Sequence, residues 1–411
     1  MQTNDFFEVA IIGGGAAGMM AALRASSIGK KNVILERNDR VGKKLLLSGD
    51  GKCNITNANI QKKNYHSSNN CFNFEPLNEF SNADTLEFFE KLGLLLLTES
   101  DGRIFPRTLQ ASTVLDALRL RLDEQGVKII NNFKVSSVHK SNGIFKILSS
   151  DGLTVASEKI ILATGGKSYQ NTGSDGSGYA IAQSFGHTIV DPVPALVQLK
   201  LFSQHLKTLT GVRTEASVKV VYNNSIISQA TGEVLFTNYG ASGPAILNSS
   251  NSIARLLKDD AEINMYINFL PGYSTGFIRQ FLLETAERYP ERTIEQLLQG
   301  LVHKRIAAVV TRELQLQDST NVRVIESYAD SILNSLTQMK FRVMGTLTFA
   351  TAQVTSGGVN TNEINETTLE SKLVKGLYFA GEVIDVNGDS GGYNLQWAWS
   401  TGWVAGSLKS E

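Results

Sequence analysis

The sequence predicts an α/β fold in which one domain is assembled from both ends of the chain around an inserted β-rich segment. Three observations predict it. Residues 9–36 read as a strand, a glycine loop, a helix and a second strand, and residues 376–408 again read as a strand, glycines and a helix. The composition and the pattern of apolar residues differ between about 191 and 350. The chain has 411 residues, 42% of them hydrophobic. That length and composition suit roughly two to three domains with cores of their own.

Residues 9–36 supply each part of a βαβ unit of the kind that binds a dinucleotide. An apolar strand, Val9 to Ile12, precedes an apolar helix, and a second strand, Val33 to Leu35, ends at Glu36. In such a unit the first glycine makes a tight turn, the second lets the backbone approach a pyrophosphate, and the third allows close helix packing. Glu36 is placed to accept the hydroxyls of an adenosine ribose. The unit does not distinguish NAD from FAD. Its G-x-G-x-x-G glycines are Gly13, Gly15 and Gly18.

The segment that follows, residues 37–57, is rich in Gly, Lys, Ser and Asn and is typical of a binding loop. Glycines let the backbone approach a ligand, and the polar side chains can meet phosphate or ring heteroatoms. A solvated surface loop is the alternative for the segment taken alone. The residues concerned are Gly42, Lys43, Lys44, Ser48, Gly49, Gly51 and Asn54.

The elements up to residue 190 are predicted from periodicity and turn residues. Residues 84–97 and 110–125 are predicted helices. A β-meander precedes a strand over residues 159–166 that ends on two glycines, and a second glycine cluster covers residues 172–187. Glycines at the carboxyl end of a parallel strand lie where open α/β sheets bind ligands. The short meander strands are Lys128 to Ile130, Phe133 to Val138, Ile144 to Leu148 and Thr154 to Ala156.

The composition changes near Asp191, where two prolines among hydrophobic residues mark a domain crossing. Strand-like stretches around the turn Asn223–Asn224 predict a small antiparallel barrel or sandwich. Residues 275–336 carry helical patterns instead. We therefore expect a nucleotide-binding domain from 1–190 and 350–411, a β-barrel-like insertion from 191–270 and 337–349, and a helical sub-domain over 271–336. The expected barrel strands are Ser217 to Tyr222, Ser225 to Gln229, Glu233 to Thr237 and Glu262 to Phe269.

The carboxyl-terminal segment carries the second strong signal. Leu377 to Ala380 is a predicted parallel strand, and Gly391–Gly392 precede a helix that begins near Asn394 to Gln396. A helix N-terminus there would direct backbone N–H groups at an electron-rich ring oxygen, as the reduction of a flavin requires. This strand has no sheet of its own, so it needs the N-terminal sheet for its burial.

Charge and cysteine content narrow the class of protein. Thirty-nine basic residues balance thirty-nine acidic ones, so the sequence favours neither nucleic acid nor an anionic membrane as a partner. Cys53 and Cys71 lack C-x-x-C spacing, which fits a cytoplasmic protein without a dithiol redox centre. We expect neither cysteine to relay electrons. The five histidines, at 66, 139, 187, 205 and 303, have no spacing that indicates a metal site.

Separated motifs of the chain resemble a family. The set IIGGGAAGMMAA, GKKLLLSGDGKCNITN, GRIFPRT, ILATGGKSYQNTGSDGSGYAIAQSFGH, PALVQL, GEVLFTNYGASGPAI, VTSGGV and GLYFAGEVIDVNGDSGGYNLQWAWSTG is similar to three-domain bacterial NAD(P)/FAD-dependent oxidoreductases of the aminoacetone oxidase-like type. The resemblance spans nearly the whole chain. It implies a Rossmann-type domain that holds noncovalent FAD, with an inserted β-barrel and a small helical domain. One departure is visible: Asp50 stands where the family usually has glycine, and Lys52 replaces arginine.

The resemblance also implies which residues hold FAD. The ADP half is assigned to the glycine loop and the end of the second strand, the adenine to the backbone of Val135, and the ring and ribityl chain to the later loops. The residues so assigned are Gly13, Gly15, Ala16, Ala17, Gly18, Glu36, Arg37, Lys44, Ser48, Gly49, Gly51, Asn54, Val135, Ala163, Thr164, Gly165, Gly381, Glu382, Asp385, Gly392, Asn394 and Leu395.

The function predicted is hydride transfer between a small organic substrate and flavin N5. The resemblance leaves both directions open, because the family includes oxidase-like activities on small amines and reductase-like activities on conjugated double bonds, the latter fed here by transiently docked NAD(P)H. A non-catalytic flavin or nucleotide sensor that binds a partner through its inserted domain is the alternative. Arg107 and Tyr393 lie beside family motifs and are the candidates for binding or protonating substrate. Substrate identity and oligomeric state stay open.

Overall fold

The computed structural model describes residues 5–257 and 262–410. The chain divides into two compact units: unit 1 comprises Met1–Val193 and Gln353–Glu411, and unit 2 comprises Pro194–Ala352. Each unit has a hydrophobic core of its own, so each is described by itself.

Unit 1 is built on a seven-stranded sheet with the order β7-β2-β1-β10-β9-β8, in which β19 also pairs with β10. Strands β7, β2, β1, β10 and β19 run parallel, whereas β9 and β8 are antiparallel. The carboxyl-terminal strand therefore lies in the sheet that the amino-terminal βαβ unit begins. The strands are β1 (Asp5–Ile12), β2 (Asn32–Leu35), β7 (Lys128–Ile130), β8 (Val135–Ser141), β9 (Ile144–Ser149), β10 (Thr154–Leu162) and β19 (Leu377–Phe379).

Strand β10 corrects one prediction. Thr154 to Ala156 and residues 159–166 are not two strands but one, which ends at Leu162 and continues through the polar Ser157–Lys159 segment. Its continuity follows from its partners, because β1 pairs with it from Val155 to Leu162 while β9 covers its first half and β19 its last three residues.

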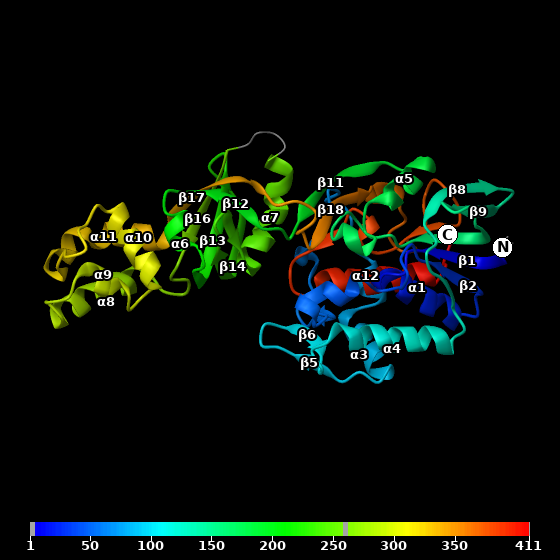
Figure 1. Ribbon diagram of the computed structural model, residues 1–411, viewed down its shortest axis with the longest axis horizontal. Coiled ribbons are helices and arrows are strands. Elements are labelled where there is room, and N and C mark those ends of the chain that lie inside the picture. The colour runs from blue at the N-terminus through cyan, green and yellow to red at the C-terminus, as the bar shows by residue number, and fades with distance from the viewer. Residues whose placement is uncertain (1–4, 258–261, 411) are drawn as a thin grey trace. The chain divides into compact units, whose positions relative to one another are not determined.

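Helices α1 (Ala16–Ser27) and α12 (Tyr393–Gly406) lie side by side although they come from opposite ends of the chain (Figure 1). Two glycines of α12 allow this approach. A Cβ atom on Gly402 would lie 2.4 Å from the Ala17 carbonyl oxygen, and one on Gly406 would lie 2.5 Å from the Ala21 carbonyl oxygen. Both distances are far shorter than a van der Waals contact, so glycine at these positions sets the helix separation.

The remaining elements of unit 1 flank the sheet. The predicted helix over 84–97 is wrong in its second half: α3 ends at Lys91, Gly93 takes φ +85°, and the next residues form an edge strand paired with β6. These elements are α2 (Pro76–Glu79), α3 (Asn82–Lys91), α4 (Ala111–Glu124), α5 (Ser177–Ser184), β3 (Thr56–Asn57), β4 (Tyr65–His66), β5 (Leu96–Thr98), β6 (Arg103–Pro106), β11 (Ile189–Ala195), β18 (Val354–Val359), β20 (Asn387–Gly388), and the 3₁₀ turns η1 (Leu45–Gly51), η2 (Lys62–Asn64), η3 (Gln170–Thr172), η6 (Thr361–Glu363) and η7 (Gly381–Val383).

Unit 2 contains a closed barrel with the order β12-β15-β14-β13-β16-β17, so the barrel and not the sandwich is its architecture. Asn223 and Asn224 both take left-handed φ values, +47° and +60°, as a tight hairpin turn requires. Residues predicted as two strands after that turn form one long strand, β14. The strands are β12 (Leu199–Phe202), β13 (Arg213–Tyr222), β14 (Ser225–Phe236), β15 (Gly240–Ser242), β16 (Ile263–Asn268) and β17 (Met339–Thr346).

The helices of unit 2 include α7, which packs on β13 and β14, and a group formed by α8 to α11 beside the barrel (Figure 1). The helices of this group are amphipathic, and their apolar faces are buried in the core of unit 2. The helices are α6 (Leu206–Leu209), α7 (Pro244–Leu256), α8 (Thr275–Arg288), α9 (Ile294–Leu298), α10 (Lys304–Glu313) and α11 (Ile325–Thr337), with η5 (Val322–Val324) between the last two.

His187 is a buried structural histidine in unit 1. Its Nε2 lies 2.7 Å from the Ser371 hydroxyl and its Nδ1 lies 3.1 Å from the Glu363 carboxylate, while its ring meets Phe379 edge to face. Burial lowers the pKa of His187, and Glu363 opposes that effect only in part.

We expect His187 to make the fold less stable as the pH falls below the ordinary histidine pKa of about 6.5. Its folded pKa is depressed, so the unfolded chain binds the proton more readily and the stabilisation is lost with acidification. Urea unfolding at pH 7.5 and 5.5 should show a smaller drop in His187→Gln than in the wild type. Equal drops would contradict this role.

Candidate functional site

The three glycines of the first loop have different surroundings. Gly13 takes φ +106°, and a Cβ there would lie 2.5 Å from the Ala163 carbonyl oxygen; one on Gly18 would lie 1.9 Å from the Gly13 carbonyl oxygen. A Cβ on Gly15 would meet no heavy atom within 4 Å, and Gly15 caps α1 without a side-chain hydrogen bond. The first-turn N–H groups of α1 therefore face open space at Gly15, as a pyrophosphate requires.

Glu36 lies at the carboxyl end of β2 beside this loop and is only 6% exposed. Its carboxylate accepts hydrogen bonds from the Gly14 N–H at 2.8 Å and from the Asn38 N–H and side chain at 2.8 and 2.7 Å. A carboxylate has about four lone-pair sites, so one acceptor position is left for a hydroxyl. The Phe133 N–H donates to the Glu36 carbonyl at 2.8 Å, which places Val135, the start of β8, near the end of β2.

Arg37 and the loop after β10 meet at the same edge of the sheet. The Arg37 guanidinium lies 2.5 Å from the Asp175 carboxylate. Burial alone would raise the pKa of Asp175, but hydrogen bonds from Arg37 and Ser177 outweigh it and hold that pKa below its ordinary value. The Ala163 N–H donates to the Ile12 carbonyl at 2.9 Å, so the loop from Ala163 to Gly165 starts beside the glycine turn.

An ion pair joins the second loop to the carboxyl-terminal segment. The Lys44 ammonium lies 2.5 Å from the Glu382 carboxylate, and both side chains are largely buried. The same carboxylate accepts the Thr355 N–H at 2.7 Å and the Gly166 N–H at 3.4 Å. Glu382 thus connects four segments that are remote in sequence. Thr355 was not among the predicted site residues, although it lies in the motif VTSGGV.

The loop that contains the predicted ring-binding residues has an unusual backbone. Gly49, Asp50 and Gly51 are three consecutive residues with left-handed φ values of +57°, +53° and +82°. Asn54 follows, buried, with its side-chain oxygen lacking a hydrogen-bond partner among the described residues. A Cβ on Gly392 would lie 2.8 Å from that oxygen, so glycine at this position lets the start of α12 approach the loop.

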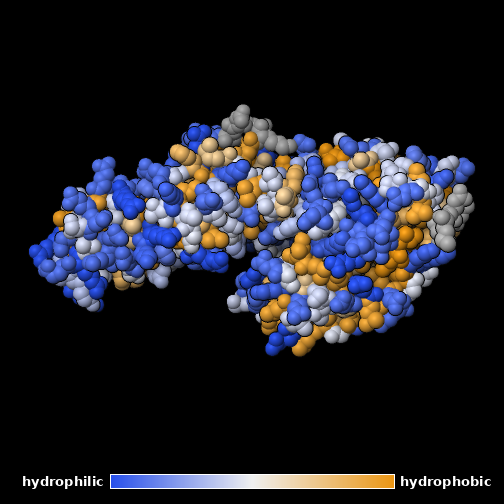
Figure 2. All heavy atoms as spheres, in the orientation of Figure 1, coloured by the Kyte–Doolittle hydropathy of each residue, from blue (hydrophilic) through white to orange (hydrophobic). Residues whose placement is uncertain are grey.

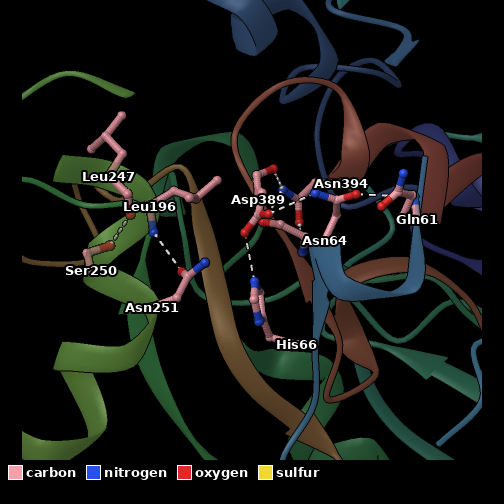
Figure 3. A network of polar contacts seen from close by, with 10 residues as sticks. Gln61, Asn64, His66, Leu196, Leu247, Ser250, Asn251, Asp389 and Asn394 are labelled. Atoms are coloured by element: carbon pink, nitrogen blue, oxygen red, sulfur yellow. Dashed lines mark hydrogen bonds and ion pairs between the residues drawn. The ribbon is translucent and has the colours of Figure 1, made fainter. Parts of the chain in front are cut away.

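Figure 3 shows the polar contacts around the turn that leads into α12. The Asn394 side chain accepts the Gly388 N–H at 2.8 Å and donates to the Gly388 and Asp389 carbonyls at 2.9 and 3.2 Å. Asp389 in turn accepts from Asn64 at 3.1 Å and pairs with His66 at 2.7 Å. The Asn394 side chain therefore holds the turn, and a contact from residues 394 and 395 to a ring would come from their backbone N–H groups, which lack intrahelical acceptors.

Asp385 is buried in the same region, where it accepts hydrogen bonds from the backbone and hydroxyl of Ser68. Gly381 takes φ +76°, donates its N–H to the Thr401 hydroxyl at 2.8 Å, and lies against Ala17 of α1. These contacts join the carboxyl-terminal motif to the first glycine loop.

Some buried polar atoms near the predicted cofactor site have no partner among the described residues, and a large polar cofactor would supply one. Such atoms are rare in folded proteins and each costs about 1–3 kcal/mol when nothing meets it. Several gather in the segments assigned to FAD, where hydroxyl, amide and carbonyl groups suit the ribityl chain and ring. They are Asn54 Oδ1, Thr164 Oγ1, Ser174 Oγ, Tyr179 OH and Asn387 Nδ2. Ser174, Tyr179 and Asn387 were not predicted; the glycine cluster over 172–187 was the available signal for the first two.

The two catalytic candidates occupy different places. Tyr393 is the first residue of α12, half-buried, and its pKa is raised by burial and then by Asp389 and Asp101. Arg107 follows β6 and is exposed, with no side-chain hydrogen bond or ion pair within residues 5–257 and 262–410. Of the two, Tyr393 lies beside the loops assigned to the ring.

Both cysteines are free thiols. Cys53 is fully buried, and burial raises the pKa of its thiol to about 12, while a hydrogen bond with Ser48 lowers it in part. Cys71 is exposed. A thiol with so high a pKa is a poor nucleophile and a poor electron relay. In the part of the chain that the structure describes, no group of His, Cys, Asp and Glu side chains has the geometry of a metal site.

We expect Cys53→Ser to retain FAD and to leave the flavin reducible by its electron donor. The only expected cost is about 1–2 kcal/mol of stability, because a hydroxyl replaces a buried thiol. Flavin absorption and anaerobic bleaching measure both properties, with Cys71→Ser as the control. If both variants bound FAD normally but lost all turnover, a thiol mechanism would replace this one.

Comparison with known proteins identifies the family. Residues 7–408 match the model of the HI0933-like protein Rossmann domain. The chain is 38% identical to the 3-dehydro-bile acid delta(4,6)-reductase of Clostridium scindens, across 98% of this chain and 99% of that protein. It is 32% identical to the ribosomal RNA dihydrouridine synthase of Escherichia coli, across 97% and 96% of the two chains.

Among solved structures, the 3-ketosteroid-delta4-(5alpha)-dehydrogenase of Rhodococcus jostii RHA1 has a similar fold, with a TM-score of 0.52 at 13% identity over 100% of this chain and 98% of that one. No helix in the described parts of the chain is long and apolar enough to cross a membrane. The chain is an FAD-dependent oxidoreductase that belongs to the HI0933-like Rossmann family.

Proposed function

We propose that this protein reduces a carbon–carbon double bond that is conjugated to a carbonyl group in a small organic molecule. The observation that carries the proposal is what the two relatives' names share. A 3-dehydro-bile acid delta(4,6)-reductase acts on double bonds near a ketone, and dihydrouridine is uridine with two hydrogens added across a ring double bond conjugated to a carbonyl. The common chemistry is a hydride delivered to the carbon remote from the carbonyl and a proton delivered to the adjacent carbon.

FAD would supply the hydride from N5 when reduced. The chain's own residues would hold and polarise it. The open position at Gly15 and the N-terminus of α1 would take the pyrophosphate, and Glu36 a ribose hydroxyl. The N-terminus of α12 would stabilise negative charge on the ring. Lys44, fixed by Glu382, would place a second positive charge beside the cofactor.

The electron donor we propose is NADH or NADPH, docked transiently. The chain has a single G-x-G-x-x-G motif after a strand, so it offers no second dinucleotide domain. Oxidation of small amines is the competing direction, and the 38% identity with a reductase favours reduction.

Reduction of uridine in RNA is a second candidate, because two relatives are named ribosomal RNA dihydrouridine synthases. An exposed row of aromatic rings at the start of α8 also favours it. Tyr273, just before the helix, stacks on Phe277 with ring centres 5.6 Å apart, and Phe277 stacks on Phe281 at 6.4 Å. Such rings can stack on unpaired bases. The balance of thirty-nine basic against thirty-nine acidic residues disfavours a polyanion as the substrate. Figure 2 shows that the visible surface over α8 to α11 is mostly hydrophilic.

The test is anaerobic mixing of FAD-loaded protein with NADH, NADPH and a panel of small amines while flavin absorption is recorded. We expect bleaching by a nicotinamide nucleotide. The reduced protein is then mixed with cyclohex-2-enone or with a uridine-rich single-stranded RNA. Reoxidation by the ketone supports the proposal; reoxidation by RNA alone supports the second candidate; bleaching by amines alone makes the protein an amine oxidase. If no donor bleaches the flavin and no acceptor reoxidises it, the proposal is wrong.

A further inference from the structure

Tyr169, in the loop after β10, has a backbone conformation that bulky residues rarely adopt. Its φ and ψ are +55° and +53°, in the left-handed region. The surrounding loop holds it there: the Lys167 N–H donates to the Thr355 hydroxyl at 2.8 Å, the Ser168 and Thr355 hydroxyls lie 3.0 Å apart, and the Thr172 N–H donates to the Tyr169 carbonyl at 2.8 Å. Strain held in place by several contacts is a feature of functional sites.

Asp50 has the same kind of conformation in the loop assigned to the flavin ring, with φ +53° and ψ +42° between two glycines. The two residues lie near enough that the Asp50 charge acts on the phenol. Burial first, and then this carboxylate, raise the pKa of Tyr169 above that of a free phenol, which is itself protonated at neutral pH. Two loops with left-handed backbone conformations therefore supply a neutral phenol and a carboxylate whose charge acts on it.

The Tyr169 hydroxyl makes no hydrogen bond within residues 5–257 and 262–410, although the side chain is half-buried. The other tyrosines of this region are less suitable as donors to substrate. The Tyr65 hydroxyl already donates to the Tyr393 carbonyl at 3.1 Å. Tyr179 is 6% exposed and lies close to Glu382 and Asp385, which belong to the cofactor cradle.

We infer that the Tyr169 hydroxyl is the acid that protonates the substrate carbon next to the carbonyl. This inference rests on the proposed reductase function. In the step, the double bond of the substrate breaks as its remote carbon receives a hydride from reduced FAD and its adjacent carbon receives the Tyr169 proton. The substrate gains two electrons and two hydrogens, NAD(P)H has supplied the electrons, and water returns a proton to the tyrosinate. The negative charge of Asp50 disfavours the tyrosinate.

The test compares the two half-reactions of Tyr169→Phe with those of the wild type. Reduction of FAD by NAD(P)H needs no proton from Tyr169, so we expect its rate and the FAD content to be unchanged. Reoxidation by 2-methylcyclohex-2-enone should slow at least about a hundredfold, which is typical of the loss of a general acid. Tyr289→Phe, at the exposed end of α8, is the matched control and should leave both rates unchanged.

Two further readouts separate a proton donor from a packing role. In D2O the wild type should place deuterium on one face of the carbon next to the carbonyl, whereas Tyr169→Phe should place it on both faces because water takes over. Tyrosinate absorption during a pH titration of the FAD-loaded protein should lose the contribution of one tyrosine in Tyr169→Phe, and the contribution of Tyr169 should shift to lower pH in Asp50→Asn.

A wild type that reduces the ketone, together with a Tyr169→Phe variant of equal rate and equal stereochemistry, would overturn the assignment of Tyr169 and leave the proposed function standing. A wild type that oxidises NAD(P)H yet leaves conjugated ketones unchanged would overturn the proposed function, and the assignment with it. The first outcome is read from the variant and the second from the wild type, so the two failures are distinguishable.

Discussion

Gly15→Val yields a folded protein that no longer retains FAD. The backbone at Gly15 is extended, with φ −80° and ψ −170°, and a Cβ there meets no heavy atom of the chain within 4 Å. A valine is therefore compatible with the fold but fills the space in which a pyrophosphate would meet the first turn of α1. We expect FAD affinity to fall at least about a hundredfold, which corresponds to about 2.7 kcal/mol. Flavin absorption per mole of purified protein and isothermal titration with FAD measure it.

Two other glycines provide the controls. Gly18→Val should damage the fold itself, because its Cβ would lie 1.9 Å from the Gly13 carbonyl oxygen. Gly276 lies on α8, and a Cβ there would meet open space. Gly276→Val should leave the FAD content unchanged and should shift the melting temperature by no more than a few degrees. Undiminished FAD content in Gly15→Val would remove this loop from the cofactor site.

Glu382→Leu destabilises unit 1 by about 2–4 kcal/mol. Leucine leaves the Thr355 and Gly166 N–H groups without their acceptor and the largely buried Lys44 ammonium without its partner. Because these contacts also hold the loop assigned to the ring, FAD should dissociate more readily. Urea unfolding followed by the fluorescence of Trp397 and Trp399, both buried in unit 1, measures the loss.

Glu382→Gln separates the contribution of the hydrogen bonds from that of the ion pair with Lys44. The glutamine amide oxygen can still accept the two N–H groups, whereas the negative charge is gone. We expect it to cost about 1 kcal/mol, and the double variant Lys44→Met with Glu382→Leu to cost less than the sum of its parts. If Glu382→Leu unfolded at the same urea concentration as the wild type, the ion pair would have no structural role.

Local patterns determined much of the architecture. The G-x-G-x-x-G loop, Glu36 at the end of β2 and the strand at Leu377–Phe379 are each readable because turn chemistry and apolar runs are properties of neighbouring residues. The fold class and the family were predicted in this way, and both are confirmed. The individual FAD contacts stay predictions.

Only the tertiary structure decided which distant residues meet. The pairing of Lys44 with Glu382 joins positions separated by 338 residues, and no local sequence pattern predicts it. The orphaned hydroxyls of Ser174 and Tyr179 and the strained Tyr169 became visible only once their surroundings were in place. The physical reason is that burial, hydrogen-bond satisfaction and backbone strain depend on the whole packed chain, whereas sequence spacing reports only on neighbours along it.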